Sequence, residues 1–479
     1  MRPNHPLPAV ALLSLLVPFA GAQESVLPRD DTRPIEPIDL HEHAPMERIG
    51  VPEQLNQVTD ALRELITADY LSDDERLALR IKHGVWTHDD LITPQHGAIA
   101  ALDAGAYDHA FLMDPNADPL VLAEAAITRG DPRRALGFIT EVPEPHSPAA
   151  LTLLAQAHEM LGQNDEALAA LTTLEAHLRT NTLTDADQVA WAAEGMLQLL
   201  RLRGPEQDAR TEYEAITKVL AMARENLDRT SWRVRLAEAR LLYAHKNYQD
   251  GRNAAVEALA LHPRNAQAAF IIGSMAVDSF DFDTADEIAH KLDLLAQSLD
   301  EGADTKRTPR ASLLGSILRA RVALRRKDPE GAEIAIDPVM ARMPNQRDLL
   351  QLNAAAAAAG FRTTSTKYLL DAYDQISPNS PFAYMRVAET LSENRQYEHA
   401  AEAFRRVIEH APHWGEPRLG LGLLLVQAGL DREARETLED ALALDPFDLR
   451  AQNSLKLVTE LATYDTIESD HFIVRYKPG

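Results

Sequence analysis

Small and large apolar residues recur at a fixed interval between residues 313 and 448. A large residue returns every 34 positions, as Ile336, Leu370, Phe404 and Leu438. A proline follows each of them eight positions later, at Pro344, Pro378, Pro412 and Pro446. Four positions before each large residue stands an alanine (Ala332, Ala400, Ala434), except for Thr366 in the second copy. A fixed period of this length indicates copies of one small structural unit that stack side by side.

The copy at residues 415–448 predicts two helices joined by a tight turn. Its apolar positions recur with helical spacing at Leu421 and Leu425 and again at Ala434, Leu438 and Ala441. Gly429 interrupts the pattern between the two sets, and Pro446 ends the second set. Neither helix can bury its apolar stripe alone, so neighbouring hairpins have to stack into a continuous core. The sequence therefore predicts an all-α fold, a superhelical solenoid.

The copy that begins at Pro381 resembles the tetratricopeptide repeat family. The residues at the family's characteristic positions are Tyr384, Val387, Ala388, Leu391, Ala400, Phe404, Val407 and Pro412. The resemblance implies a right-handed α-solenoid of stacked helical hairpins. It also implies that the first helix of each hairpin lines a concave groove that binds protein or peptide segments.

Weaker copies of the same pattern precede the four regular units. Residues 52–299 are expected to form degenerate repeat-like hairpins, the first of them atypical. The polar segment 300–312 interrupts the period and is predicted to be an exposed loop or hinge before the regular units at 313–448. Residues 449–463 are amphipathic and are predicted to cap the last hairpin as a single helix.

The pattern changes to that of a strand in the tail, residues 464–479. Polar and apolar residues alternate from Asp470 to Tyr476, and several are β-branched or aromatic. Because a single strand is not stable alone, the tail either pairs with another chain or begins a further part of a longer polypeptide. Its last dozen residues resemble the opening strand of a gluzincin-type (peptidase MA-like) domain that follows such repeat arrays in some exported bacterial proteins.

The gluzincin resemblance carries no catalytic residue onto this chain. That family holds zinc with a His-Glu-x-x-His helix, and the sequence contains no such pentad. The nearest fragment, His158-Glu159, is followed by Met160-Leu161-Gly162 in a repeat helix. A His-Glu-His run at residues 41–43 is interpreted as a solvated polar segment, because a metal site needs further ligands held nearby. We therefore expect no metal, no cofactor and no catalytic site, and interpret this chain as non-enzymatic.

The first 22 residues are typical of an export signal. Arg2 precedes an apolar run, and Ala20-Gly21-Ala22 forms a small-residue cleavage site. Residues 23–51 hold several prolines and mixed charges and are predicted to be an extended linker. We expect a periplasmic or extracellular protein without membrane insertion after cleavage, because no later segment has ~18 continuous apolar residues.

Composition narrows the classes of partner. The 73 acidic and 48 basic residues give a formal net charge of −25, which repels nucleic acid and anionic membrane surfaces. Cysteine is absent, which excludes disulfides, thiolate metal sites and cysteine nucleophiles. The expected partner is therefore a protein or a peptide, and the oligomeric state stays open.

The resemblance assigns the groove to unit positions 2, 5, 9, 12 and 13 of the first helices. Carried onto this chain, those positions give Arg233, Leu236, Arg240, Tyr243, Phe270, Leu314, Ile317, Arg321, Arg325, Phe382, Met385, Glu389, Leu419 and Leu423. Four arginines on an otherwise acidic molecule favour an extended ligand that bears carboxylates. The alternative is that these arginines pair with acidic side chains of neighbouring units.

Two functions follow from these patterns. The first is an exported scaffold that binds extended peptide segments or assembles an envelope complex. The second is an N-terminal targeting or regulatory array of a zinc metallopeptidase-like protein, whose catalytic domain would lie beyond residue 479.

Overall fold

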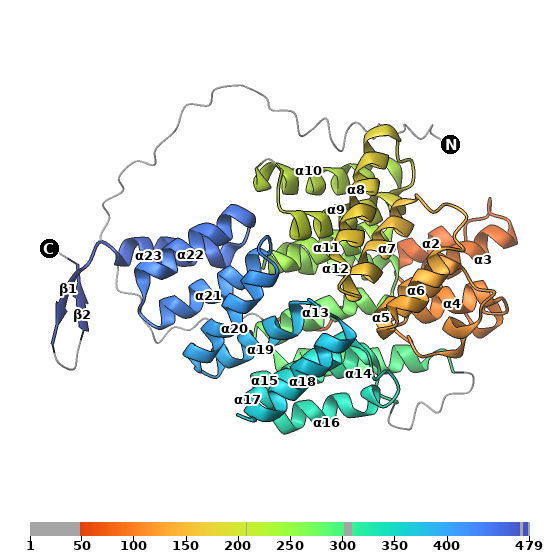
Figure 1. Ribbon diagram of the computed structural model, residues 1–479. Helices are drawn as coiled ribbons and strands as arrows, with labels where there is room; N and C mark the ends of the chain where they lie inside the picture. Colours follow the sequence, from red (N-terminus) through yellow and green to blue (C-terminus); the bar gives the residue numbers. More distant parts are fainter. Residues whose placement is uncertain (1–47, 207, 301–308, 470–472, 478–479) are drawn as a thin grey trace.

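The computed structural model describes residues 48–206, 208–300, 309–469 and 473–477, and in these residues the chain is a solenoid of helical hairpins (Figure 1). The earlier hairpins are α2 (Asp60–Ile66) with α3 (Asp73–Lys82), α4 (Pro94–Asp103) with η3 (Ala110–Met113), α5 (Pro119–Arg129) with α6 (Pro132–Ile139), α7 (Pro148–Met160) with α8 (Asn164–Thr180) and α9 (Ala186–Arg203) with α10 (Ala209–Met222). Short helical turns η2 (His88–Asp90) and η4 (Ala223–Leu227) accompany them.

The later hairpins continue the same arrangement. They are α11 (Trp232–Ala244) with α12 (Tyr248–Leu261), α13 (Ala266–Asp278) with α14 (Phe282–Gln297), α15 (Leu313–Arg325) with α16 (Pro329–Met340), α17 (Arg347–Ala359) with α18 (Thr363–Ile376), α19 (Phe382–Glu393) with α20 (Tyr397–His410) and α21 (Gly415–Gln427) with α22 (Asp431–Leu444). A single helix, α23 (Leu449–Leu461), packs on the last hairpin. The predicted all-α solenoid is confirmed. The export signal, most of the linker and residues 301–308 lie outside the described residues.

Small residues let the paired helices approach closely. A side chain at Gly422 on α21 would overlap Leu438 on α22. The alanines of the period, such as Ala434, are completely buried. The prolines of the period lie just beyond the second helices: α18 ends at Ile376, two residues before Pro378. Because proline cannot continue a helix, the spacing in the sequence becomes the length of one hairpin.

The array curls until its later hairpins contact its earlier ones (Figure 1). Five successive hairpins, from α4–η3 to α11–α12, contact later parts of the array through their turns. Each turn packs against a junction between two later hairpins, and this junction directly follows the hairpin five places further along the chain. The contacting turn and junction residues are, in order, Asp108 with Arg310, Gly130 with Asn345, Gly162 with Pro378, Gly204 with His413 and His245 with Asp445. We call this line of contacts the seam. Both sides advance by one hairpin at each step, so the seam is a second regular level of packing.

The hydrophobic core crosses the seam at one end only. The largest buried cluster joins Tyr107, from the α4–η3 hairpin, to Ala266 and Leu314. A separate cluster, confined to residues 384–458, forms the core of the C-terminal arm, by which we mean α19 to α23. Among the described residues this arm cluster includes none from α7 to α12. The arm therefore meets the earlier hairpins without a shared aliphatic core.

The tail forms a hairpin of its own. Strand β1 (Asp465–Glu468) pairs antiparallel with β2 (Ile473–Tyr476). Strand β2 lies within the strand predicted from 470 to 476, of which residues 470–472 lie outside the described residues, and it pairs with the segment just before it, which the alternation did not reveal. Arg475 forms an ion pair with Asp431 and donates to the carbonyl oxygen of Gly429 at 2.8 Å, so the tail lies beside the turn between α21 and α22.

The described N-terminal residues are attached to the solenoid. The amide N–H of Ile49 donates to Asp281 at 2.9 Å, and Arg252 donates to the Ile49 carbonyl at 3.0 Å. The end of the linker predicted over residues 23–51 is therefore part of the folded solenoid, because Ile49 and Val51 pack on the core. In the described part of the chain, no helix has the length and apolar character needed to cross a membrane.

Candidate binding cavity

The first helices of successive hairpins surround a large cavity of about 1490 Å³. Its wall comes from α11, α13, α15, α17, α19 and α21, and the ends of α5 and α7 close one side. Neighbouring hairpins are related by a nearly constant step, so each presents the same face of its first helix. The cavity is therefore a direct product of the repeat.

Most of the predicted groove residues line this cavity. The 11 residues are Tyr243, Phe270, Leu314, Ile317, Arg321, Arg325, Phe382, Met385, Glu389, Leu419 and Leu423. They come from α11, α13, α15, α19 and α21, so the fold brings together side chains that are far apart in the sequence. Their role in ligand binding stays a prediction.

Three predicted groove residues lie outside the cavity: Arg233, Leu236 and Arg240. Leu236 is 3% exposed and belongs to the large core cluster. The guanidinium of Arg233 pairs with Glu124 on α5 at 3.7 Å, and that of Arg240 pairs with Glu194 on α9 at 2.5 Å. Helices α5 and α9 thus cover the first part of α11, which the repeat pattern alone cannot show.

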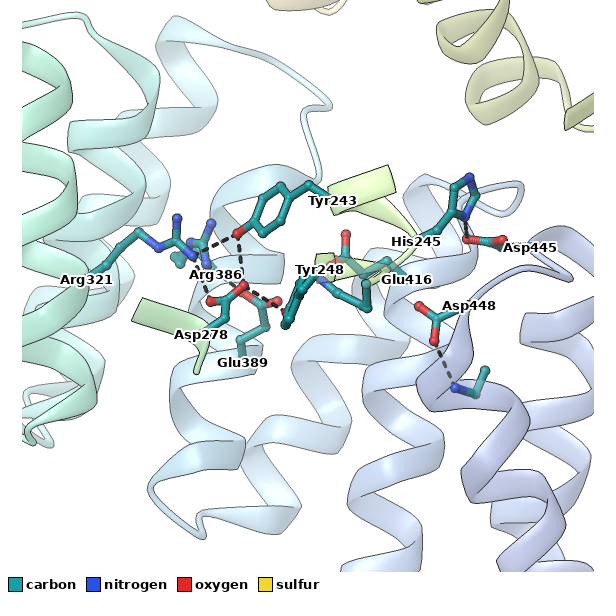
Figure 2. Close-up of polar contacts among 12 residues, drawn as sticks. Tyr243, His245, Tyr248, Asp278, Arg321, Arg386, Glu389, Glu416, Asp445 and Asp448 are labelled. Carbon is teal, nitrogen blue, oxygen red and sulfur yellow. Dashed lines mark hydrogen bonds and ion pairs between the residues drawn. The ribbon is translucent and has the colours of Figure 1, made fainter. Parts of the chain in front are cut away.

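The two arginines that do line the cavity are also bound by acids of the chain, and Figure 2 shows the pair of Arg321 with Asp278. Arg321 lies 2.9 Å from Asp278 and donates to the hydroxyl of Tyr243 at 3.1 Å. Arg325 lies 2.7 Å from Glu393. All four predicted arginines therefore pair with acidic side chains of other hairpins, as the alternative interpretation has it.

Asp278 is the centre of a buried polar network (Figure 2). The hydroxyls of Tyr243 and Tyr248 donate to its carboxylate at 2.9 and 3.2 Å. Burial acts to raise the pKa of Asp278, but the charges of Arg321 and Lys246 outweigh it and hold that pKa below its usual value. The network joins α11, α12, α13 and α15, so it fixes one wall of the cavity.

Glu389 presents a carboxylate from α19 to the opposite side of the cavity. Its side chain is 31% exposed and pairs with Arg386 at 2.9 Å. Partial desolvation raises the pKa of Glu389, and the nearby Glu416 and Glu393 raise it further against the opposing charges of Arg386 and Lys246. This carboxylate is therefore harder to ionise than an ordinary glutamate, although it pairs with Arg386.

An apolar stripe runs beside these charges. It consists of Phe270, Leu314, Ile317, Met385, Leu419 and Leu423. Phe382 and Trp414 extend it as an edge-to-face pair with ring centroids 5.3 Å apart. Within the described ranges, no cluster of histidine and acidic side chains has the arrangement of a metal site. The cavity therefore offers apolar contacts next to polar ones, as a surface for binding a chain segment does.

Several cavity residues were not predicted from the sequence. Glu393 and Glu416 occupy unit positions 13 and 2, so the same repeat register, applied to every unit, would have identified both. Lys246 and Trp414 lie outside the first helices, in a turn and a junction. No repeat position marks them, because they reach the cavity only through the curvature of the array.

Comparison with protein families supports the repeat assignment. Two family models described as Tetratricopeptide repeat match residues 391–457 and residues 120–182 and 236–285. The chain contains tetratricopeptide repeats. The match at 120–182 covers α5 to α8, so some of the irregular earlier hairpins are tetratricopeptide repeats as well as the regular ones.

Several solved structures resemble the chain at low identity. The Cut9-Hcn1 hetero-tetramer of APC/C matches at 13% identity and a TM-score of 0.38, over 83% of this chain and 69% of that one. Yeast Tom70 matches at 17% and 0.35, over 81% and 89%. YrrB, described as a TPR protein with an unusual peptide-binding site, matches at 15% and 0.20, over 50% and 97%. Comparison with curated proteins gives no match. At such identities the similarity concerns the fold alone.

Proposed function

We propose that this protein is a tetratricopeptide-repeat scaffold that holds an extended segment of a partner protein in its central cavity. The observation that carries the proposal is the cavity itself. Its volume of about 1490 Å³ exceeds the roughly 300–1,000 Å³ of sites for small molecules. Tetratricopeptide repeats bind proteins or peptides, and the apolar stripe beside charged groups suits alternate side chains of a bound segment.

Site-specific photo-crosslinking tests the proposed cavity. A photoreactive amino acid replaces Leu314 or Phe382, which line the cavity, or Tyr368, which is 72% exposed on α18 and outside the cavity. We expect the two cavity positions to crosslink one common partner in cells and the control position to miss it. Crosslinking of that partner only from Tyr368 would contradict the proposal. Charge reversal at Arg321 is a poor test, because it breaks the network around Asp278.

The proposal includes export. It rests on the N-terminal residues 1–22, whose apolar run and small-residue cleavage site are typical of a signal peptide. In the source cell, fractionation and N-terminal sequencing are expected to find the mature chain outside the cytoplasm, beginning near residue 23. Recovery of the chain in the cytoplasm with residues 1–22 retained would contradict export.

The tail supports a second candidate function, the repeat array of a metallopeptidase-like protein. The β1–β2 hairpin leaves Ile467 and Val474 more than half exposed, so its apolar side chains can be covered by further structure. The resemblance of the last dozen residues to a gluzincin-type domain points the same way. Reading the gene downstream of residue 479 for a His-Glu-x-x-His helix decides between a scaffold and a peptidase array.

A further inference from the structure

The C-terminal arm, residues 382–461, is a packing unit of its own. Phe404 is 1% exposed and Leu438 is completely buried, and both lie in a cluster whose buried residues come from α19 to α23, with Leu370 of α18 partly buried against it. The arm meets the preceding hairpins through Ala354, Ala358 and Val387, with Leu369, Leu370 and Leu391 partly buried against them, and through the Arg325–Glu393 ion pair. Only three side chains are fully buried in this joint, far fewer than in the cluster of the arm itself, so turning at the joint exposes less apolar surface than opening the arm would.

The contact of the arm across the seam is made by charged and aromatic side chains, among them His245 and Asp445 (Figure 2). His245 lies 2.8 Å from Asp445, and Lys246 lies 3.4 Å from Glu416. Further along, the guanidinium of Arg201 lies over the Phe382 ring at 5.2 Å. Such groups can exchange their partners for water, so the contact can open without leaving buried polar atoms unpaired.

Both surfaces meet at the cavity. The arm supplies Phe382, Met385, Glu389 and Leu419 to the cavity wall, and the earlier hairpins supply the opposite wall. Lys246 belongs to both features, because it lines the cavity and also bonds the arm. A rotation of the arm about its alanine joint therefore changes the width of the cavity.

We propose that the C-terminal arm opens and closes the cavity as a unit, turning about the α17–α19 contact and held closed by the His245–Asp445 and Lys246–Glu416 contacts. We call these two contacts the clasp. Its use in admitting a protein segment rests on the proposed function, whereas the opening itself does not.

Distance measurements by pulsed electron paramagnetic resonance test the clasp without any partner. The chain has no cysteine, so introduced pairs are the only labelled sites. One pair, at Lys218 on α10 and Glu436 on α22, spans the clasp, and a second, at Arg133 on α6 and Lys367 on α18, spans the glycine part of the seam. All four positions are exposed.

Breaking the clasp should move one pair only. In the double variant His245→Ala, Lys246→Glu, we expect longer and broader distances for the first pair and unchanged distances for the second. Lys456→Glu, at an exposed lysine of α23, makes the same charge change away from the clasp and should alter neither pair. Unchanged distances for the first pair, or broadening of both pairs together, would overturn the proposal.

Access to the cavity gives an independent measurement. A single cysteine at Ile317, which is 5% exposed in the cavity wall, reports opening through its rate of reaction with a maleimide. We expect the clasp variant to react roughly tenfold faster than the parent, and the Lys456→Glu control to react at the parent rate. Equal rates in all three proteins would overturn the proposal. The clasp could open as expected while no partner crosslinks in the cavity. In that case the proposed function would be wrong, and the proposal that the arm moves would still stand.

Discussion

The middle steps and the last step of the seam differ in whether main-chain or side-chain atoms make the contact. At its middle steps, main chain meets main chain: Gly130 and Gly162 have positive φ, and a Cβ at either would overlap the carbonyl oxygen of Asn345 or Pro378. At its last step the corresponding turn carries Lys246, and long side chains bridge the gap. Backbone contact holds two turns at one fixed distance, whereas side-chain contact permits several. The glycine steps of the seam therefore hold the array rigid, and the last step, at Lys246, is the one at which the proposed motion occurs.

The turns beyond the seam extend the comparison. Phe280, Lys327, Phe361 and Arg395 all have positive φ, although this conformation favours glycine. Phe361 is 70% exposed and Arg395 is also exposed, so these side chains lie in open space. A side chain is therefore tolerated at these open turns, whereas Gly130 and Gly162 meet main chain; Gly429, with nothing within 4 Å of an added Cβ, is a turn glycine that no close approach requires.

Substitution of Gly162 should give the largest effect. Gly162→Ala adds a Cβ that overlaps the Pro378 carbonyl, so we expect a loss of about 3 kcal/mol in the free energy of unfolding. Gly429→Ala is the matched control, because Gly429 has a similar φ of 75° against 71° and nothing within 4 Å of the added atom. It should cost about 1 kcal/mol. Equal losses in urea denaturation would contradict the close contact at the seam.

Removal of Arg347 should rank second. Its guanidinium donates to the carbonyl oxygens of Gly130 at 2.6 Å and Ile376 at 3.0 Å, and also to those of Asn345 and Met160. Arg347→Ala leaves these acceptors without their donor, so we expect a loss of about 2 kcal/mol.

A second arginine provides the control for that experiment. Arg395 is exposed, and Arg395→Ala should cost less than about 0.5 kcal/mol. Thermal unfolding of both variants measures the difference. If Arg347→Ala were as mild as Arg395→Ala, the bonds from Arg347 across the seam would not contribute to stability.

Substitutions in the clasp should have a smaller effect. Lys246→Ala and Glu416→Ala are each expected to cost about 1 kcal/mol or less, because the Glu416 side chain is 38% exposed and water replaces the lost contact. The double variant should cost less than the sum, with a coupling of about 0.5 kcal/mol. Fully additive losses would show that the two side chains do not interact.

Glu389 gives the smallest expected change, and it depends on pH. Its pKa is raised in the folded protein, so the folded state binds a proton more readily than the unfolded state does. Ionised Glu389 therefore lowers stability at pH values above its raised pKa. Glu389→Gln, which stays neutral, should be more stable than the parent at pH 7, and this advantage should shrink as the pH falls through the raised pKa. If the stability advantage of Glu389→Gln grew as the pH fell, the pKa of Glu389 would not be raised in the folded protein.

The sequence predicted the contacts between neighbours well and those across the seam poorly. The period at Pro344 and Pro378 marks the length of each hairpin, because a proline ends the second helix. The same register identified most of the cavity wall. Arg233 is covered by α5, and the clasp joins His245 to Asp445. Both contacts join residues that are far apart in the sequence, 200 positions apart in the His245–Asp445 contact. No local pattern encodes such a pairing, since it follows from small rotations that accumulate along the array.

The regular step of the seam limits how this array can change in length. In an open solenoid each unit touches only its neighbours, so a unit can be duplicated or deleted with local consequences. Here, duplication of α13–α14 would preserve every neighbour contact and yet place each earlier turn opposite the wrong junction, with Gly162 facing the junction meant for Gly130. The number of units between the two sides is therefore fixed by geometry, and the modularity that repeat proteins usually enjoy is lost.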